Sequence, residues 1–199
     1  SNTAIGYFAL TTNTTNDGNT AVGRAALYTC ASANNTAVGS ETADALTTGA
    51  QNTAVGRYAL TNTTGGSDNA VVGYNALADN VNGGQNAALG REALKANTAN
   101  SNTAVGYRSL YVNTTGARNT AVGANALDAN TTGADNIAVG QNALTANTTA
   151  SSNVAVGGNA AAANTTGANI VAIGDGALAA NTTASNNVAV GYQALLANT

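Results

Sequence analysis

Tyrosine and arginine recur at a fixed spacing along this 199-residue chain, and they are the side chains best suited to binding a ligand. From Arg57 onward, successive members of the series are 17, 17 and 16 residues apart. Stacked one above another, such residues would form a cation–π ladder contributing about 0.5–1 kcal/mol per exposed contact. The stripe is a candidate surface for recognising a glycan or protein of a host surface, and its members are Tyr7, Arg24, Arg57, Tyr74, Arg91 and Tyr107.

The alternative for this stripe is an ordinary solvated face with some local stabilisation. Residues 124–176 keep the same sequence pattern but lack the stripe, having Ala124, Gln141, Gly158 and Asp175 at the equivalent positions. The stripe is therefore not part of the repeat itself.

Catalytic and metal-binding chemistry finds little support in the residues. The chain has no histidine, which removes an imidazole base and every Ser/His/Asp or Cys/His arrangement. Cys30 is the single cysteine and replaces a turn asparagine. Asp17, Asp68 and Asp135 are too far apart along the sequence for a repeated calcium site. We expect no enzyme activity, no metal site and no cofactor.

The composition also excludes several function classes. Charged residues make up 8% of the chain, and the net charge is −3, which gives no electrostatic footprint for nucleic acid. No stretch approaches the ~18–20 apolar residues of a membrane-spanning helix. Hydrophobic residues make up 44% and recur regularly, which favours an ordered chain over a disordered low-complexity one.

A tandem repeat organises the whole chain. Each unit reads approximately N-T-A-V-G-x-x-A-L-x-x-N-T-T-G-x-x, so that twelve units form a single repeat domain over residues 1–199. The invariant glycine, which we expect in a turn, is Gly6, Gly23, Gly39, Gly56, Gly73, Gly90, Gly106, Gly123, Gly140, Gly157, Gly174 or Gly191.

Two aliphatic columns run through the units. The residue before the glycine is Val, Ile or Leu in every unit, and we expect this column to be the core. A leucine four residues after the glycine forms the second column, in which Ala43 and Ala161 are gaps.

The unit length predicts short strands rather than helices, because 17 residues cannot hold two helices and a turn. We expect two strands per unit, one over T-A-V and one over A-L-x, with turns at the glycine and at N-T-T-G. Stacked at about 4.8 Å, twelve coils would rise about 55–60 Å as an all-β parallel β-solenoid. The absence of proline agrees with strands that are paired on both sides.

The position before the aliphatic column is alanine in eleven units and Val71 in the other. Adjacent strand residues face opposite sides, so valine in the core would turn alanine outward, where a second chain could approach closely. We therefore expect a homo-oligomer, the alternative being that alanine only keeps an exposed strand slim. The chain opens on a repeat and stops at Asn198-Thr199 within a unit, so we also expect it to be part of a longer fibre.

The N-T-A-V-G-x-x-A-L units resemble the head repeats of trimeric autotransporter adhesins and the repeats of phage tail-fibre proteins. The resemblance covers all twelve units. It implies a left-handed parallel β-roll, a side-by-side homotrimer, and an extracellular place on a cell or virion surface. The stalk, anchor and chaperone domain of those families have no counterpart in these residues, which leaves the choice between the two families open.

The leading functional hypothesis is a non-enzymatic structural and adhesive segment of a surface fibre that mediates attachment. The alternative is an ice-binding β-solenoid, because Thr3, Thr20, Thr36 and Thr53 begin a regular threonine column. That column is broken over half its length. The N-T-T triplets match the glycosylation sequon, but their turn chemistry explains them without a sugar.

Overall fold

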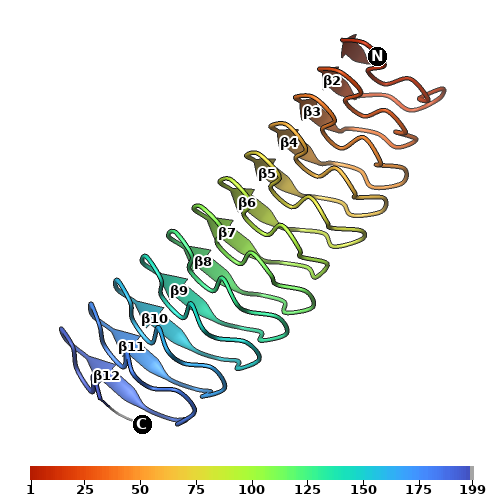
Figure 1. Cartoon of the computed structure of the whole chain (residues 1–199). Coiled ribbons are helices and arrows are strands. Elements are labelled where there is room, and N and C mark those ends of the chain that lie inside the picture. Colours follow the sequence, from red (N-terminus) through yellow and green to blue (C-terminus); the bar gives the residue numbers. More distant parts are fainter. Residues whose placement is uncertain (198–199) are drawn as a thin grey trace.

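The computed structural model describes residues 1–197, so that Asn198 and Thr199 lie outside the described part. Twelve three-residue strands stack in parallel, in chain order, as one sheet along one side of a solenoid (Figure 1). Each strand pairs in register with its copy in the next coil, for example Thr103 with Thr120. The strands are β1 Thr3–Ile5, β2 Thr20–Val22, β3 Thr36–Val38, β4 Thr53–Val55, β5 Ala70–Val72, β6 Ala87–Leu89, β7 Thr103–Val105, β8 Thr120–Val122, β9 Ile137–Val139, β10 Val154–Val156, β11 Val171–Ile173 and β12 Val188–Val190.

The prediction of a second strand in each coil was wrong. The A-L-x segment is a series of turns, in which Leu110 and Leu127 adopt left-handed backbone conformations with φ of 50° and 52°. Arg108 and Asn125, two residues before these leucines, are left-handed as well, and a chain with left-handed residues at every second position cannot form an extended strand here. The backbone still bonds between coils, since the Leu110 N–H donates to the carbonyl of Ala126 at 3.0 Å. One side of the solenoid is therefore a sheet, and the rest is a stack of hydrogen-bonded turns.

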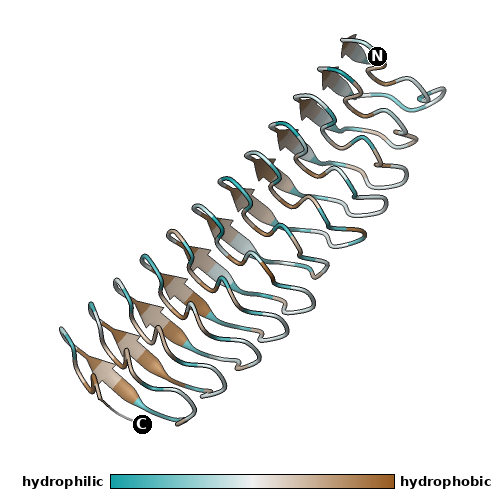
Figure 2. Cartoon of the chain, viewed as in Figure 1, coloured by the Kyte–Doolittle hydropathy of each residue, from teal (hydrophilic) through white to brown (hydrophobic). Residues whose placement is uncertain are grey.

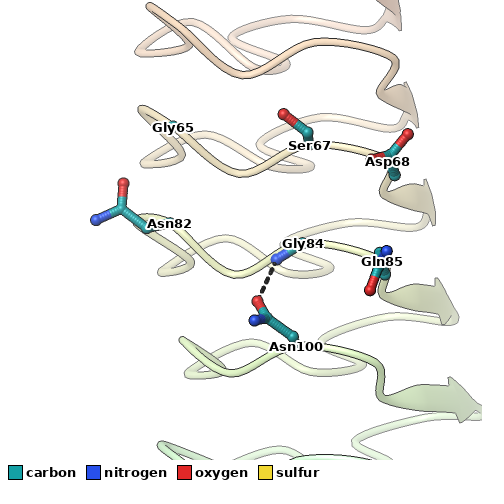
Figure 3. A pocket seen from close by; sticks show the side chains of 7 residues that line it. All are labelled: Gly65, Ser67, Asp68, Asn82, Gly84, Gln85 and Asn100. Carbon is teal, nitrogen blue, oxygen red and sulfur yellow. Dashed lines mark hydrogen bonds between the residues drawn. The ribbon is translucent and has the colours of Figure 1, made fainter.

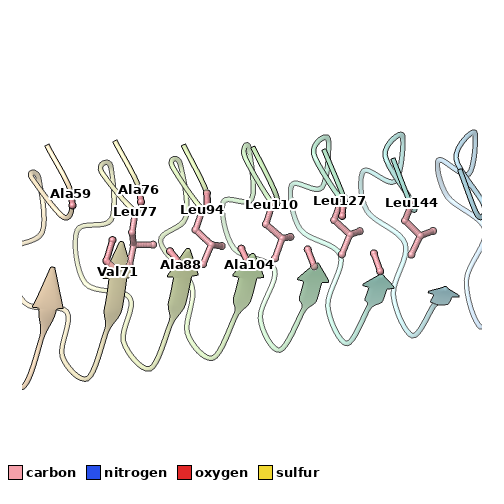
Figure 4. Packing of buried hydrophobic residues seen from close by; sticks show 14 of the residues in the cluster. Ala59, Val71, Ala76, Leu77, Ala88, Leu94, Ala104, Leu110, Leu127 and Leu144 are labelled. Atoms are coloured by element: carbon pink, nitrogen blue, oxygen red, sulfur yellow. The ribbon is translucent and has the colours of Figure 1, made fainter. Parts of the chain in front are cut away.

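The assignment of the valine column to the core was also wrong. The middle residue of each strand from β2 to β12 points inward, and it is alanine in all of them except β5, where it is Val71. Ala121 and Ala138 are fully buried, whereas Val156 is 36% exposed and Leu89 51%. The buried leucines project towards the strands from the opposite wall (Figure 4). Because these leucines already occupy most of the narrow interior, the strand position facing them holds a small side chain, which is alanine except at the buried Val71. The small side chain thus serves internal packing rather than approach of a second chain.

Two columns of buried asparagines run along the interior beside the apolar core. In the first column, the Asn136 amide donates to Asn119 Oδ1 at 3.1 Å and to the Ala150 carbonyl at 2.9 Å. In the second, the Asn130 amide donates to Asn113 Oδ1 at 2.7 Å. Such ladders satisfy buried polar groups and fix the register of the coils. The second column contains most of the N-T-T asparagines, whose amides are thereby enclosed and already hydrogen-bonded.

The invariant glycine ends each strand with a conformation that other residues rarely adopt. Gly123 has a φ of 136°, and a Cβ atom built on it would lie 2.5 Å from the carbonyl oxygen of Gly140 in the next coil. Both the φ value and the close approach of the backbones require glycine here. Each of these glycines directly follows its strand.

The two gaps in the leucine column are filled from elsewhere in the same loops. Between β3 and β4, Ala43 is accompanied by the buried Leu46, which stands in an asparagine column. Between β10 and β11, Ala161 is accompanied by the buried Ile170, which interrupts the first asparagine column. On either side of Ile170, the side-chain nitrogens of Asn153 and Asn187 have no hydrogen-bond partner. Isoleucine in place of asparagine at position 170 keeps the interior filled but interrupts the hydrogen bonds of the first asparagine column.

Candidate functional site

The turn after each strand carries the tyrosines and arginines, and in coils four to seven it brings them into contact. The Arg91 guanidinium lies over the rings of Tyr74 and Tyr107, at 5.7 and 5.9 Å from their centroids. Arg57 lies over the ring of Tyr58 in its own coil, at 4.5 Å, rather than over Tyr74. The rings of Tyr58 and Tyr74 meet edge to face at 6.0 Å. The contacts thus run continuously from Arg57 to Tyr107.

A second row of contacts lies beside the first. Arg108 stacks over the ring of Tyr111 at 4.0 Å, and the Lys95 ammonium is 5.6 Å from the same ring. We call the two rows together the tyrosine–arginine stripe, which consists of Arg57, Tyr58, Tyr74, Arg91, Lys95, Tyr107, Arg108 and Tyr111.

Sequence reasoning on one column missed four of these residues, Tyr58, Lys95, Arg108 and Tyr111. They occupy the second and fifth positions after the glycine. The signal was available, because those columns also concentrate aromatic and basic residues in the same coils. What the sequence could not show is that the tight turn projects all three columns to one edge.

Tyr7 and Arg24 do not belong to this group. They lie in the first two coils, and Ser40 separates them from Arg57 in the column. Arg24 is ion-paired with Glu41, while the Tyr7 ring packs against Phe8 with centroids 3.9 Å apart. The six predicted stripe residues therefore form two separate sets, of which only the set in coils four to seven is continuous.

Two acids lie next to the stripe. Arg108 Nε is 4.0 Å from Glu92 Oε2 and 3.8 Å from Asp128 Oδ1, and neither Nε nor this Oδ1 has a hydrogen-bond partner. Burial raises the pKa of Asp128, and the nearby Arg108 lowers it less. Glu92 Oε1 also lies 3.4 Å from Nη2 of Arg91. With four cations and two acids, the stripe keeps a modest positive charge in an acidic chain.

The outward face of the sheet is a second candidate surface. In the first coils it carries alternating threonine and valine or isoleucine, whereas in β9–β12 both outward columns are aliphatic (Figure 2). These eight side chains are Ile137, Val139, Val154, Val156, Val171, Ile173, Val188 and Val190. A contiguous exposed apolar patch of this kind usually marks a site of interaction.

An open depression lies among the segments of coils four to six that lead into the strands (Figure 3). It is lined by the backbone of Gly65 and Gly84 and by polar side chains, of which Asp68 is the only charged one. The Gly84 N–H donates to Asn100 Oδ1 at 2.7 Å across it. The glycine pairs Gly65-Gly66 and Gly83-Gly84 thus lie in the segments that connect the strands, and the depression has no cation that would hold a phosphate.

Within residues 1–197, no group of three or more His, Cys, Asp or Glu side chains is placed to hold a metal ion. Cys30 is buried, with its Sγ 3.5 Å from the carbonyl oxygen of Ser32. The same residues contain no helix that is long and apolar enough to cross a membrane.

No protein-family model, no curated protein and no solved structure matches this chain. The geometry of the two surfaces is therefore the basis for a functional proposal.

Proposed function

We propose that this chain is a non-enzymatic structural and adhesive segment of an extracellular or virion-surface fibre, in which copies of the chain associate side by side through the outward face of the sheet. The observation that carries this proposal is the unbroken aliphatic face of β9–β12. The resemblance of the repeat to adhesin heads and tail fibres favours three chains.

The complete interior supports this role for the outward face. Leucine, alanine and asparagine already fill each coil, so the outward valines contribute nothing to the core of their own chain. Val156 and Ile173, which have a coil on either side, are 36% and 39% exposed. Removing apolar surface from water stabilises by about 25 cal/mol per Å², so association of these faces is favourable. Continuous backbone bonding between coils makes the single chain a stiff unit, which suits a spacer that holds an attachment surface away from its base.

Molar mass measured by light scattering on a sizing column tests the association. We expect a mass of three chains for the native protein. Val156 and Ile173 are neighbours on β10 and β11, so the double variant Val156→Lys/Ile173→Glu places an ion pair across two strands without changing the net charge. This variant should be monomeric and remain folded by circular dichroism.

The matched control is Thr149→Lys/Thr166→Glu, which introduces the same charges at exposed turn positions of two adjacent coils. It should keep the native mass. A native protein that is monomeric at every concentration, or a sheet-face variant with the mass of the native protein, would overturn the proposed association.

One observation favours ice binding as a second candidate function. The threonine side chains of β1–β4 lie on the outward face of the sheet, in register and about 4.8 Å apart. A regular, flat array of hydroxyl and methyl groups is the type of surface that can order water in a lattice. Thermal hysteresis is the measurement: ice binding predicts a freezing point below the melting point, and coincident values exclude it.

A further inference from the structure

Two residues of the tyrosine–arginine stripe, Tyr58 and Arg108, lie where the backbone of the coil disfavours bulky side chains. The second position after the glycine is left-handed in every coil, with φ values of 61° for Tyr58 and 53° for Arg108. Asparagine and glycine tolerate this conformation best, whereas bulky side chains are uncommon in it. Coils eight to eleven follow that preference, with Asn125, Asn142, Asn159 and Gly176 at the position.

The same coils show that the fold does not need the stripe. Their turns have the backbone conformation of coils four to seven, yet they carry no tyrosine or arginine at the first and second positions after the glycine. Four of the six basic residues of the whole chain lie in the stripe. Basic and aromatic side chains gathered on one edge, two of them in a locally disfavoured conformation, are typical of a binding surface.

We propose that the stripe binds an extended, linear polysaccharide in which neutral and acidic sugars alternate. This inference rests on the proposed attachment role and names its ligand. Arg57, Tyr74, Arg91 and Tyr107 occupy one column of four successive coils, about 4.8 Å apart. An extended β-linked polysaccharide advances by close to this distance per sugar ring. Such a chain lying along the stack meets arginine and tyrosine in turn.

Each type of residue selects its own kind of sugar. Tyr74 and Tyr107 are 41% and 44% exposed. Arg91 covers one face of each ring, and the exposed remainder of the ring offers apolar contact to the C–H groups of a sugar. The Arg91 side chain is 61% exposed and contacts Glu92 only through Nη2, so the guanidinium can also pair with a sugar carboxylate. The stacked tyrosines hold this guanidinium in place before the ligand arrives.

The modest charge of the stripe favours a sparsely charged polysaccharide over a nucleic acid. Glu92 and Asp128 offset two of the four cations. A nucleic acid carries a phosphate on every nucleotide, and its binding needs a more strongly basic surface. An acid on every second sugar matches the two-coil spacing between Arg57 and Arg91.

Isothermal titration calorimetry on the full chain tests the proposal with three hexasaccharides. The probes are a hyaluronan oligomer, which alternates acidic and neutral sugars, cellohexaose, which is neutral, and an oligogalacturonate, which is acidic on every ring. We expect the hyaluronan oligomer to bind most tightly, and its affinity to fall as salt is added. Tyr74→Ala/Tyr107→Ala should weaken binding at least about tenfold, and Arg91→Gln should abolish the preference over cellohexaose.

The matched control is Tyr7→Ala/Tyr192→Ala, which removes two exposed tyrosines at the same first position after the glycine, in the first and last coils. It should bind like the native chain. A second measurement tests whether the left-handed conformation of Tyr58 destabilises the folded chain. Tyr58→Asn should raise the unfolding midpoint and at the same time weaken binding of the hyaluronan oligomer.

Three outcomes would overturn the proposal: no binding of any hexasaccharide, equal affinity for all three, or equally tight binding of a single-stranded oligothymidylate. None of them bears on the mass of the native protein. A trimer that binds no sugar would therefore reject the stripe as a site and leave the proposed association in place. A monomer that binds the hyaluronan oligomer would reject the association and leave the stripe in place as a site.

Discussion

Left-handed backbone conformations recur at fixed residues of each coil, and they decide which side chains the repeat tolerates. Leu127 accepts a φ of 52° because its side chain is buried in the core, which offsets the strain. Arg108 has a similar φ of 53°, but its side chain is 34% exposed and lies outside the core. Its stacking over the Tyr111 ring, rather than burial in the core, offsets the strain. A left-handed residue that is buried therefore belongs to the core of the repeat, whereas one that is exposed is a candidate for binding.

Gly157 and Gly158 are adjacent in sequence but differ in what they require. Gly157 has a φ of 136°, and an added Cβ would lie 2.5 Å from the backbone of Gly174, whereas the nearest atom to a Cβ on Gly158 is an Asp175 carboxylate oxygen at 3.5 Å. Gly157→Ala should therefore cost about 3 kcal/mol or more of the free energy of unfolding. Gly158→Ala should change it by less than about 0.5 kcal/mol. Urea denaturation of both variants measures the difference, and equal costs would contradict the close-packed turn.

Asp128 should make the stability depend on pH. Burial raises the pKa of Asp128 in the folded state. As the pH falls, the folded chain therefore binds a proton before the unfolded chain does. The free energy of unfolding consequently decreases as the pH rises through the folded pKa. Asp128→Asn removes this effect. The variant should be more stable than the native protein at neutral pH, with an advantage that shrinks as the pH falls towards about 4. Thermal unfolding across this range is the measurement, and a native protein that is more stable than the variant at neutral pH would show that pairing with Arg108 dominates.

At the level of elements, the sequence predicted the coil length, the parallel stacking and the glycine turn. It could not place valine and alanine correctly, because both are apolar and strand alternation leaves open which of them faces inward. The size of Leu110 and its equivalents decides this, since they fill the interior from the opposite wall. The second strand was predicted from the A-L pattern, but a left-handed leucine leaves no trace in hydropathy. For the same reason, the turn that groups Tyr58 and Tyr111 with the predicted stripe could not be anticipated.

The loop between β10 and β11 offers a test of the two interior columns. Ala161→Leu/Ile170→Asn restores the common residue at both positions, which gives the Asn187 amide an acceptor and keeps the interior filled. We expect a gain of about 1–2 kcal/mol in the free energy of unfolding, because an unsatisfied buried amide costs about that much. Ala161→Leu alone should destabilise by about 1–3 kcal/mol through overpacking. Chemical denaturation at one chain concentration compares the single variants and the double variant. If the free-energy changes of Ala161→Leu and Ile170→Asn simply add up in the double variant, the two positions do not compensate for each other.

At the scale of the molecule, two surfaces lie at different heights of the same stack. The tyrosine–arginine stripe belongs to coils four to seven, and the aliphatic sheet face to coils nine to twelve. Within residues 1–197, β1 and β12 each pair with a neighbouring strand on one side only. Such edges can pair with another chain, so end-to-end stacking is a physical alternative to side-by-side association.

Small-angle X-ray scattering on the native chain separates these arrangements most directly, because it gives particle mass and length together. Twelve coils at about 4.8 Å make one chain about 55 Å long. We predict a particle of three chains that is about as long as one chain and correspondingly thicker in cross-section. A particle whose length grows in proportion to its mass, or one with the mass and cross-section of a single chain, would contradict side-by-side association through the outward face.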